Sequence, residues 1–162
     1  NPSKFVGANR PIEQVNFFDV EEFVEKSNGE CRLPSEAEWE YASRGGANAR
    51  YYWGNMMDDA YAWYADNSGE ETHPVGEKLP NQYGLYDMMG NVWEWCSDLY
   101  NRNYYKNSPA KDPEGPSGGA TRVLRGGGWK SKPEQLRTVD RNDFVPTSKK
   151  FANIGLRLAR SP

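Results

Sequence analysis

Two acidic residues, Asp87 and Glu94, flank the part of this chain that is hardest to assign to regular structure. Residues 82–98 combine aromatic side chains, glycines and carboxylates. A half-buried strand would alternate apolar and polar residues, and a helix tolerates glycine poorly, so we predict a tight aromatic turn. Such a turn brings backbone carbonyls and both carboxylates toward one point, and this set of oxygen ligands suits calcium. The alternative is that the two carboxylates only accept hydrogen bonds from backbone N–H groups of the turn.

A second candidate site is the polar segment 129–151, which lies between two predicted strands. Loops of this kind on a rigid scaffold often carry binding sites. We predict that the loop binds a peptide or protein, and that its binding face is lined by Trp129, Lys130, Phe144 and Phe151. The alternative is a solvated surface loop with structural arginines, because one guanidinium can bind several carbonyls. These arginines are Arg125, Arg137, Arg141 and Arg157.

The remaining reactive residue types indicate little further chemistry. The single histidine, His73, precedes Pro74 and supports neither a catalytic triad nor an iron site with two histidines. The glycines of 126–128 lack the following Lys-Ser/Thr and helix of a phosphate-binding loop. Cys31 and Cys96 fit either one disulfide or two thiols, and Cys96, beside an aromatic cluster, is predicted to lie in the core.

Length and composition predict one domain over residues 1–162 with a core rich in aromatic side chains. The chain has 162 residues, a formal net charge of −3, six Trp, ten Tyr and six Phe, and large rings can fill a core that has few aliphatic residues. The absence of a basic block argues against a nucleic-acid partner, and no apolar run has the length of a membrane span. The chain begins at Asn1 without Met, so a leader sequence is compatible with it and an extracytoplasmic location stays open.

Capping patterns predict two helices. One begins at Asp19, where Asp19 and Glu22 form a capping pair, and ends near Asn28-Gly29. The other begins at Ser35, with Glu38 as its capping partner, and ends at Gly45-Gly46. Between residues 47 and 121 we expect loops and short strands, and we expect later strands at Thr121–Arg125 and Ile154–Ala159.

Several ordered motifs resemble the formylglycine-generating enzyme family, also called sulfatase-modifying factors. They are Arg32-Leu-Pro-Ser-Glu-Ala-Glu-Trp-Glu-Tyr-Ala-Ser-Arg-Gly-Gly46, Tyr52-Trp-Gly-Asn55, Gly84-Leu-Tyr-Asp-Met-Met-Gly-Asn-Val-Trp-Glu-Trp95, Arg122-Val-Leu-Arg-Gly-Gly-Gly-Trp129 and Asn153-Ile-Gly-Leu-Arg-Leu-Ala159. The resemblance implies an α+β, C-type-lectin-like fold with about two helices, short antiparallel strands and many loops. It also implies that the chain starts partway into the family domain. Strand 154–159 would then lack its usual neighbour, and an unpaired edge favours self-association.

The resemblance also says where family chemistry would lie. Enzymes of this family oxidise a cysteine of a target protein to formylglycine, using oxygen and copper held by two cysteines. The corresponding positions here are Ser131 and Leu136, which offer no soft ligand for Cu(I). The family's structural calcium would be bound by the carboxylates of Asp87 and Glu94 and the carbonyls of Gly90 and Val92. A second family calcium site, near residues 63–69, departs from the pattern at Trp63 and Asn67.

These observations favour a non-catalytic ligand- or protein-binding module with structural calcium and without copper. Two alternatives remain: a copper- and oxygen-dependent oxidoreductase with an unusual site, and a regulatory domain of a larger protein such as a kinase. Some relatives with this fold are the variable ligand-binding proteins of diversity-generating retroelements. Lys130 and Lys132 fit poorly with variation from asparagine codons, so the sequence does not identify a diversified protein.

Overall fold

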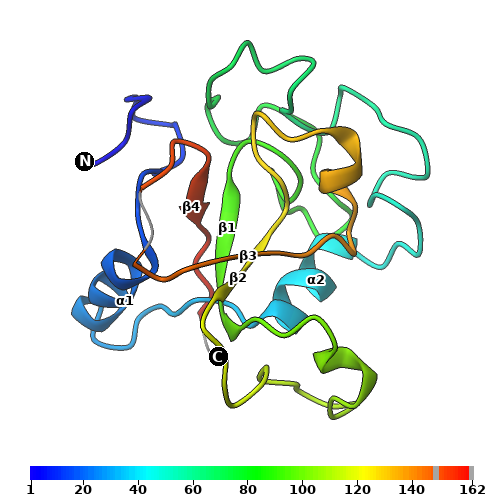
Figure 1. The fold of residues 1–162 in the computed structure, drawn as a ribbon. Helices are drawn as coiled ribbons and strands as arrows, with labels where there is room; N and C mark the ends of the chain where they lie inside the picture. Colours follow the sequence, from blue (N-terminus) through cyan, green and yellow to red (C-terminus); the bar gives the residue numbers. More distant parts are fainter. Residues whose placement is uncertain (148–149, 161–162) are drawn as a thin grey trace.

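Two helices and four short strands are joined by long loops in the computed structural model, which describes residues 1–147 and 150–160 (Figure 1). This arrangement confirms the predicted α+β fold. The elements are α1 (Phe17–Lys26), α2 (Glu36–Arg44), β1 (Trp93–Leu99), β2 (Arg122–Arg125), β3 (Asn142–Phe144), β4 (Ile154–Leu156) and two 3-10 turns, Tyr104–Lys106 and Pro133–Leu136.

The strands form one mixed sheet in the order β3-β2-β1-β4. β1 pairs antiparallel with β2, and β2 pairs antiparallel with β3. β4 runs parallel to β1, so the expectation of antiparallel strands is wrong for this edge. The central strand is the second half of the segment for which we predicted a turn. Because β1 is buried on both faces and carries the buried acids Glu94 and Asp98, it lacks the alternation that marks a half-buried strand.

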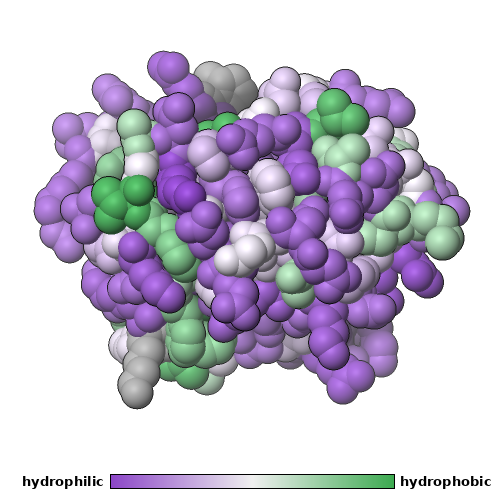
Figure 2. All heavy atoms as spheres, turned by 90° about the horizontal axis from the view of Figure 1, so that it is seen from above, coloured by the Kyte–Doolittle hydropathy of each residue, from purple (hydrophilic) through white to green (hydrophobic). Residues whose placement is uncertain are grey.

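Each face of the sheet has its own apolar core. Trp93 and Trp95 of β1 and Leu124 of β2 pack with α1, whereas Cys96 and Val123 belong to the core that includes α2. Neighbouring residues of one strand therefore point to opposite faces, as the pleat requires. Figure 1 shows α1 and α2 on opposite sides of β1. The surface seen in Figure 2 is mostly hydrophilic, with apolar side chains in small separate groups.

The first helix begins three residues earlier than predicted. Asn16 is its N-cap: the Asn16 Oδ1 accepts a hydrogen bond from the Asp19 N–H at 2.9 Å, and the Asp19 carboxylate accepts one from the Asn16 N–H at 2.8 Å. Asp19 is thus the third helical residue of a capping box and not the cap. The helix ends at Lys26, and Asn28 and Gly29 follow with left-handed φ values of 52° and 86°.

The second helix begins and ends where its sequence predicts. Ser35 and Glu38 form both bonds of the capping box, at 3.2 and 2.8 Å. Gly45 ends the helix in the left-handed conformation, with φ of 55°. Its side chains link the sheet to the loop that follows β2, as described below.

The outer edge of β4 is covered in part. Gly155 forms an antiparallel bridge with Glu13, and Ala159 exchanges backbone hydrogen bonds with Arg32 at 2.8 and 2.9 Å. A Cβ on Gly155 would lie 2.3 Å from the Ile12 carbonyl oxygen, so only glycine permits this contact. Residues 12–14 and 32 therefore occupy much of the edge that we expected to be unpaired.

The structure also shows the state of the two cysteines and the character of the two helices. Cys31 and Cys96 are both free thiols, and burial within the core raises the pKa of Cys96. Within residues 1–147 and 150–160, neither helix has the length and apolar character needed to cross a membrane.

Candidate functional site

The predicted calcium ligands line one cavity. Asp87 is buried and adopts a left-handed φ of 55°, and its Oδ2 accepts a hydrogen bond from the Gly76 N–H at 2.7 Å. Burial raises the pKa of Asp87, and the nearby negative charge of Glu94 raises it further. The cavity, of about 470 Å³, is lined by Asp87, Gly90, Val92 and Glu94 together.

Glu94 already has strong partners within the protein. Its carboxylate accepts a hydrogen bond from the Trp39 indole N–H at 2.6 Å and two from the Arg157 guanidinium, both at 3.0 Å. Arg157 lines the same cavity. The four predicted ligands therefore line one cavity, and a cation there would share Glu94 with Arg157. Within residues 1–147 and 150–160, no group of three or more His, Cys, Asp or Glu side chains is placed to hold a metal ion.

The region of the doubtful second calcium site holds a stack of three side chains. The Trp63 ring lies 3.7 Å from the His73 ring, nearly parallel to it, and the Lys78 Nζ lies 3.7 Å from the Trp63 ring centroid. Asn67 accepts a hydrogen bond from the Tyr64 N–H and donates one to the Ala62 carbonyl. Both residues that depart from the family pattern thus have structural roles in this loop.

Ser131 and Leu136, at the positions of the family's copper-binding cysteines, are both buried. The Ser131 Oγ accepts a hydrogen bond from the Gly128 N–H at 3.0 Å. Leu136 is fully buried and belongs to the core on the α2 side of the sheet. Neither position offers a thiolate, and Cys96 lies elsewhere, within β1.

Three of the four predicted ligand-binding residues surround one pocket of about 280 Å³, which we call the loop pocket. The rings of Phe144 and Phe151 meet edge to face, with centroids 5.1 Å apart, and Lys130 lies beside them. The floor comes from the sheet, with Trp93, Leu124 and Ile154.

Trp129 does not line this pocket. Its indole N–H donates to the Ala152 carbonyl at 2.8 Å, and its ring packs edge-on against Phe5 at 5.9 Å between centroids. The pocket instead has four neutral polar residues that the sequence did not single out: Ser131, Gln135, Asn142 and Asn153. They lie up to 22 positions apart in the chain, so only the fold brings them together.

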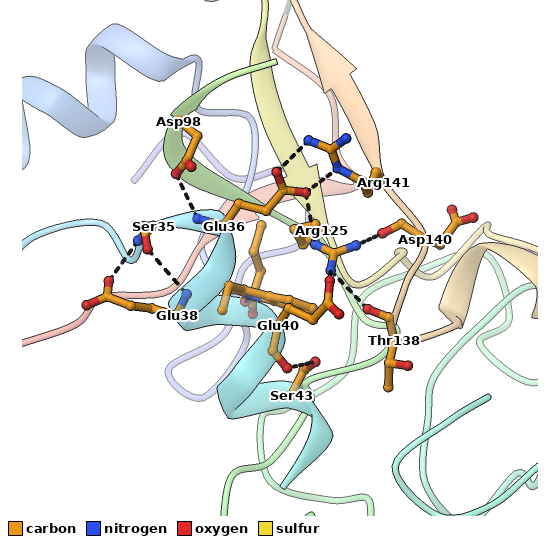
Figure 3. Close-up of polar contacts among 12 residues, drawn as sticks. Ser35, Glu36, Glu38, Glu40, Ser43, Asp98, Arg125, Thr138, Asp140 and Arg141 are labelled. Atoms are coloured by element: carbon orange, nitrogen blue, oxygen red, sulfur yellow. Dashed lines mark hydrogen bonds and ion pairs between the residues drawn. The ribbon is translucent and has the colours of Figure 1, made fainter. Parts of the chain in front are cut away.

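A buried charged network fixes the middle of the 129–151 loop, at residues 138–141 (Figure 3). Arg125 on β2 is fully buried and pairs with Glu36 and Glu40 of α2. Its guanidinium also donates to the carbonyls of Thr138, at 2.9 Å, and Asp140.

A second arginine extends this network. Arg141 binds both oxygens of Glu36, at 2.6 and 2.7 Å. The Asp98 carboxylate accepts a hydrogen bond from the Glu36 N–H at 2.7 Å. With the Arg157–Glu94 pair described above and an ion pair between Arg137 and Asp140, all four arginines that we considered as braces make structural contacts. The acidic residues of α2 were missed because the capping pattern of that helix is also typical of an exposed helix.

Comparisons with known proteins identify the relatives of this chain. The family model described as "Sulfatase-modifying factor enzyme 1-like domain" matches residues 2–162. The chain is 39% identical over 168 aligned positions to the formylglycine-generating enzyme of Streptomyces coelicolor, with 93% of this chain and 52% of that protein covered. It thus spans about half the length of that relative.

Two further similarities involve proteins with other names. The serine/threonine-protein kinase pkn1 of Chlamydia caviae is 46% identical over 118 positions, which cover 71% of this chain and 19% of the kinase. The solved structure of Treponema denticola variable protein 1 superposes with a TM-score of 0.83 at 29% identity, covering 100% of this chain and 78% of that one.

Proposed function

This chain belongs to the family of sulfatase-modifying factor enzyme 1-like domains, and we propose that it is a non-catalytic module that binds a peptide or protein through the 129–151 loop. The observation that carries the proposal is the pair Ser131 and Leu136. At the positions where the family's oxidising enzymes carry copper-binding cysteines, this chain has a hydroxyl that accepts a backbone hydrogen bond and a core side chain. One fold can support several functions, so the family scaffold does not by itself imply the oxidising activity.

The activity prediction follows from these two positions. We expect no conversion of cysteine to formylglycine in a sulfatase-type peptide, with or without added copper, because the ligands for Cu(I) are missing. Mass spectrometry of the peptide after incubation in air measures this directly, and the Streptomyces coelicolor relative serves as the positive control. Loss of the thiol mass that depends on this protein would establish the alternative, an oxidoreductase with an unusual site.

A second candidate function is regulation within a larger protein. It is favoured by the similarity to pkn1, in which the matched region makes up about a fifth of the kinase. A domain of this kind would use the same loop for recognition, so the two proposals share a site. The intact reading frame that contains this sequence distinguishes them, because a regulatory domain requires an attached catalytic one.

We also propose a structural calcium ion in the cavity beside β1. Asp87 and Glu94 would contribute carboxylates, and Gly90 and Val92 would contribute carbonyls, because all four residues line this cavity. When bound, the ion would supply positive charge that offsets the two buried acids and would hold the turn before β1 in place.

The melting temperature should therefore be higher in the presence of calcium than in the presence of EDTA. At a free concentration of 100 times Kd, mass action adds about 2.7 kcal/mol to the free energy of unfolding. Asp87→Ala should abolish the shift, whereas Glu114→Ala, at an exposed position outside this cavity, should retain it. Equal melting temperatures in calcium and EDTA, with no metal found by elemental analysis, would contradict the proposal.

The binding face can be tested with peptides selected from a display library of short random sequences. Phe144→Ala and Phe151→Ala should each weaken the binding of a selected peptide by about 2 kcal/mol if these rings are anchors. Both rings are only half-buried, so we expect the domain to remain folded. Trp129→Ala should have a smaller effect on binding, because its ring packs on Phe5 outside the loop pocket.

Thermal melts of each variant beside its binding curve provide the control. Tyr41→Ala, on the exposed side of α2, is a matched substitution of an aromatic residue outside the loop pocket. If the phenylalanine variants unfold early and the rest of the loop surface tolerates substitution without loss of binding, the proposed binding face is wrong.

A further inference from the structure

In three of the four polar residues of the loop pocket, the side-chain oxygen accepts a backbone hydrogen bond, whereas the side-chain hydrogens have no partner among the described residues. The Ser131 Oγ accepts from the Gly128 N–H at 3.0 Å. The Gln135 Oε1 accepts from the Lys132 N–H at 3.1 Å, and the Asn142 Oδ1 accepts from the Asp143 N–H at 2.9 Å. In each case the side-chain oxygen serves the backbone, and the hydroxyl or amide hydrogens of the same group remain.

No partner takes up these hydrogens within residues 1–147 and 150–160. The side-chain amide nitrogens of Gln135, Asn142 and Asn153 make no hydrogen bond there, and none of them is a fully buried, unsatisfied atom. They are therefore open to solvent or to a ligand. A site with several free donors and few free acceptors favours a ligand group that only accepts hydrogen bonds.

Charge in the loop pocket points the same way. Lys130 is the one cation among the residues that line it, and none of those residues is acidic. The Lys130 Nζ lies 5.9 Å from the Trp129 ring centroid and 6.0 Å from that of Phe151. In the described part of the chain it has no carboxylate within 4.0 Å, whereas Lys26 and Lys150 each have one. Most other lysines of the described chain are also unpaired, so what distinguishes Lys130 is its place at the loop pocket, where its charge has no acidic neighbour.

We propose that the loop pocket binds a carboxylate of the peptide or protein ligand, held by the Lys130 ammonium and by the free hydrogens of Ser131, Gln135, Asn142 and Asn153. An ionised carboxylate only accepts hydrogen bonds, so it matches the free donors and the single positive charge. The pocket volume, about 280 Å³, accommodates one side chain or one chain end. The carboxylate therefore comes from an Asp or Glu side chain or from a C-terminus, with the rings of Phe144 and Phe151 against its apolar part. This inference rests on the proposed binding function and names the chemistry of its ligand.

Two display libraries separate the sources of the carboxylate. One presents short random peptides with a blocked C-terminus, and the other presents them with a free C-terminus. Enrichment of Asp or Glu at one position in the first library indicates a side chain, whereas selection in the second library alone indicates a chain end. Synthetic copies of a selected peptide, with the critical acid and with its amide, are then titrated by fluorescence anisotropy.

We expect the amide form to bind about tenfold more weakly than the acid form, because a hydrogen bond to a charged group is lost. In Lys130→Gln the preference for the acid should fall well below tenfold, because only the neutral donors remain, and in Gln135→Glu the acid form should be rejected. The Gln135→Glu side chain can still accept from Lys132 but replaces the free amide donor with a negative charge. Lys130 and Gln135 are exposed, so both variants should fold. Lys106→Gln, an exposed lysine outside the pocket, is the matched control and should preserve the tenfold difference.

Each result decides between the two proposals. Peptides that bind through Phe151 but tolerate loss of their acids would overturn the carboxylate inference and leave the binding function standing. A tenfold preference for the acid that persists in Lys130→Gln would also overturn it. If neither library yields a peptide that binds, both the inference and the proposed function are wrong.

Discussion

Replacing Arg125 by methionine should lower the free energy of unfolding by about 3–5 kcal/mol, the usual cost of breaking a buried ion pair. Arg125 is fully buried between the second strand and the second helix, and it pairs with Glu36 and Glu40. Methionine has a similar length, so the loss comes from charge and hydrogen bonds rather than from a cavity. For a chain of this size the melting temperature should fall by roughly 10 °C.

The cost has two separable parts. Without Arg125, the carbonyls of Thr138 and Asp140 lose their buried donor, and Glu36 retains only Arg141. In the double variant Arg125→Met and Glu36→Gln, the charge imbalance is reduced, so the combined cost should be smaller than the sum of the single costs. Arg102→Met, at an exposed loop position, controls for the change of residue type and should have little effect. Additive costs in the double variant would show that the charges are not coupled.

The same network bears on the binding proposal. Arg125 binds the backbone carbonyls of residues 138 and 140, and the pocket residues Asn142 and Phe144 come shortly after residue 140 in the chain. A rigid base reduces the entropy that a binding loop loses when its ligand is bound. A milder variant such as Arg141→Lys tests this positioning role, because Lys cannot reproduce the bidentate contact with Glu36. An unchanged free energy of unfolding together with an altered peptide affinity would indicate that the network positions the loop.

Sequence patterns predicted the fold best where local chemistry alone defines an element. The second helix begins at Ser35 and ends at Gly45 as expected, because a capping box and a left-handed glycine act within a few residues. The first helix was placed three residues late because both Asn16 and Asp19 are good caps, and the phenylalanines at 17 and 18 do not distinguish them. The sequence predicts a turn where the central strand lies, because Glu94 and Asp98 are buried acids whose partners lie far away in the chain.

The candidate sites also differ in how far the local sequence can predict them. The four proposed calcium ligands come from one short motif, so the sequence could group them, and the structure places them around one cavity. The contact between Glu94 and Arg157, which lies 63 residues later in the chain, depends on tertiary structure. The loop pocket depends on tertiary structure more strongly, because the free hydrogens of Gln135 and Asn142 can be recognised only once the partners of their oxygens are known.

Gly90→Ala should be the most damaging single methyl group in the motif before the central strand. Gly90 has a left-handed φ of 84°, and a Cβ on it would lie 2.2 Å from the Trp63 carbonyl oxygen. That oxygen also accepts the Asn91 N–H at 2.8 Å, so the methyl group must push apart two segments joined by a backbone hydrogen bond. The left-handed conformation costs about 1–2 kcal/mol for alanine, and overpacking adds about 1–3 kcal/mol.

Gly84→Ala separates these two terms within the same motif. Gly84 has a similar φ of 75°, but a Cβ there would meet no atom within 4 Å. Its substitution should therefore cost only the conformational part, about 1–2 kcal/mol. Gly84 also lines the proposed calcium cavity but is not one of the proposed ligands, so the calcium-dependent rise in melting temperature should remain. Gly90→Ala should cost more and should also weaken that rise, because Gly90 is itself one of the proposed calcium ligands and its close contact with Trp63 would be disturbed. Urea denaturation of both variants measures the difference. Equal costs would mean that the Trp63 segment yields freely, and that the close contact with Gly90 does not hold the cavity in shape.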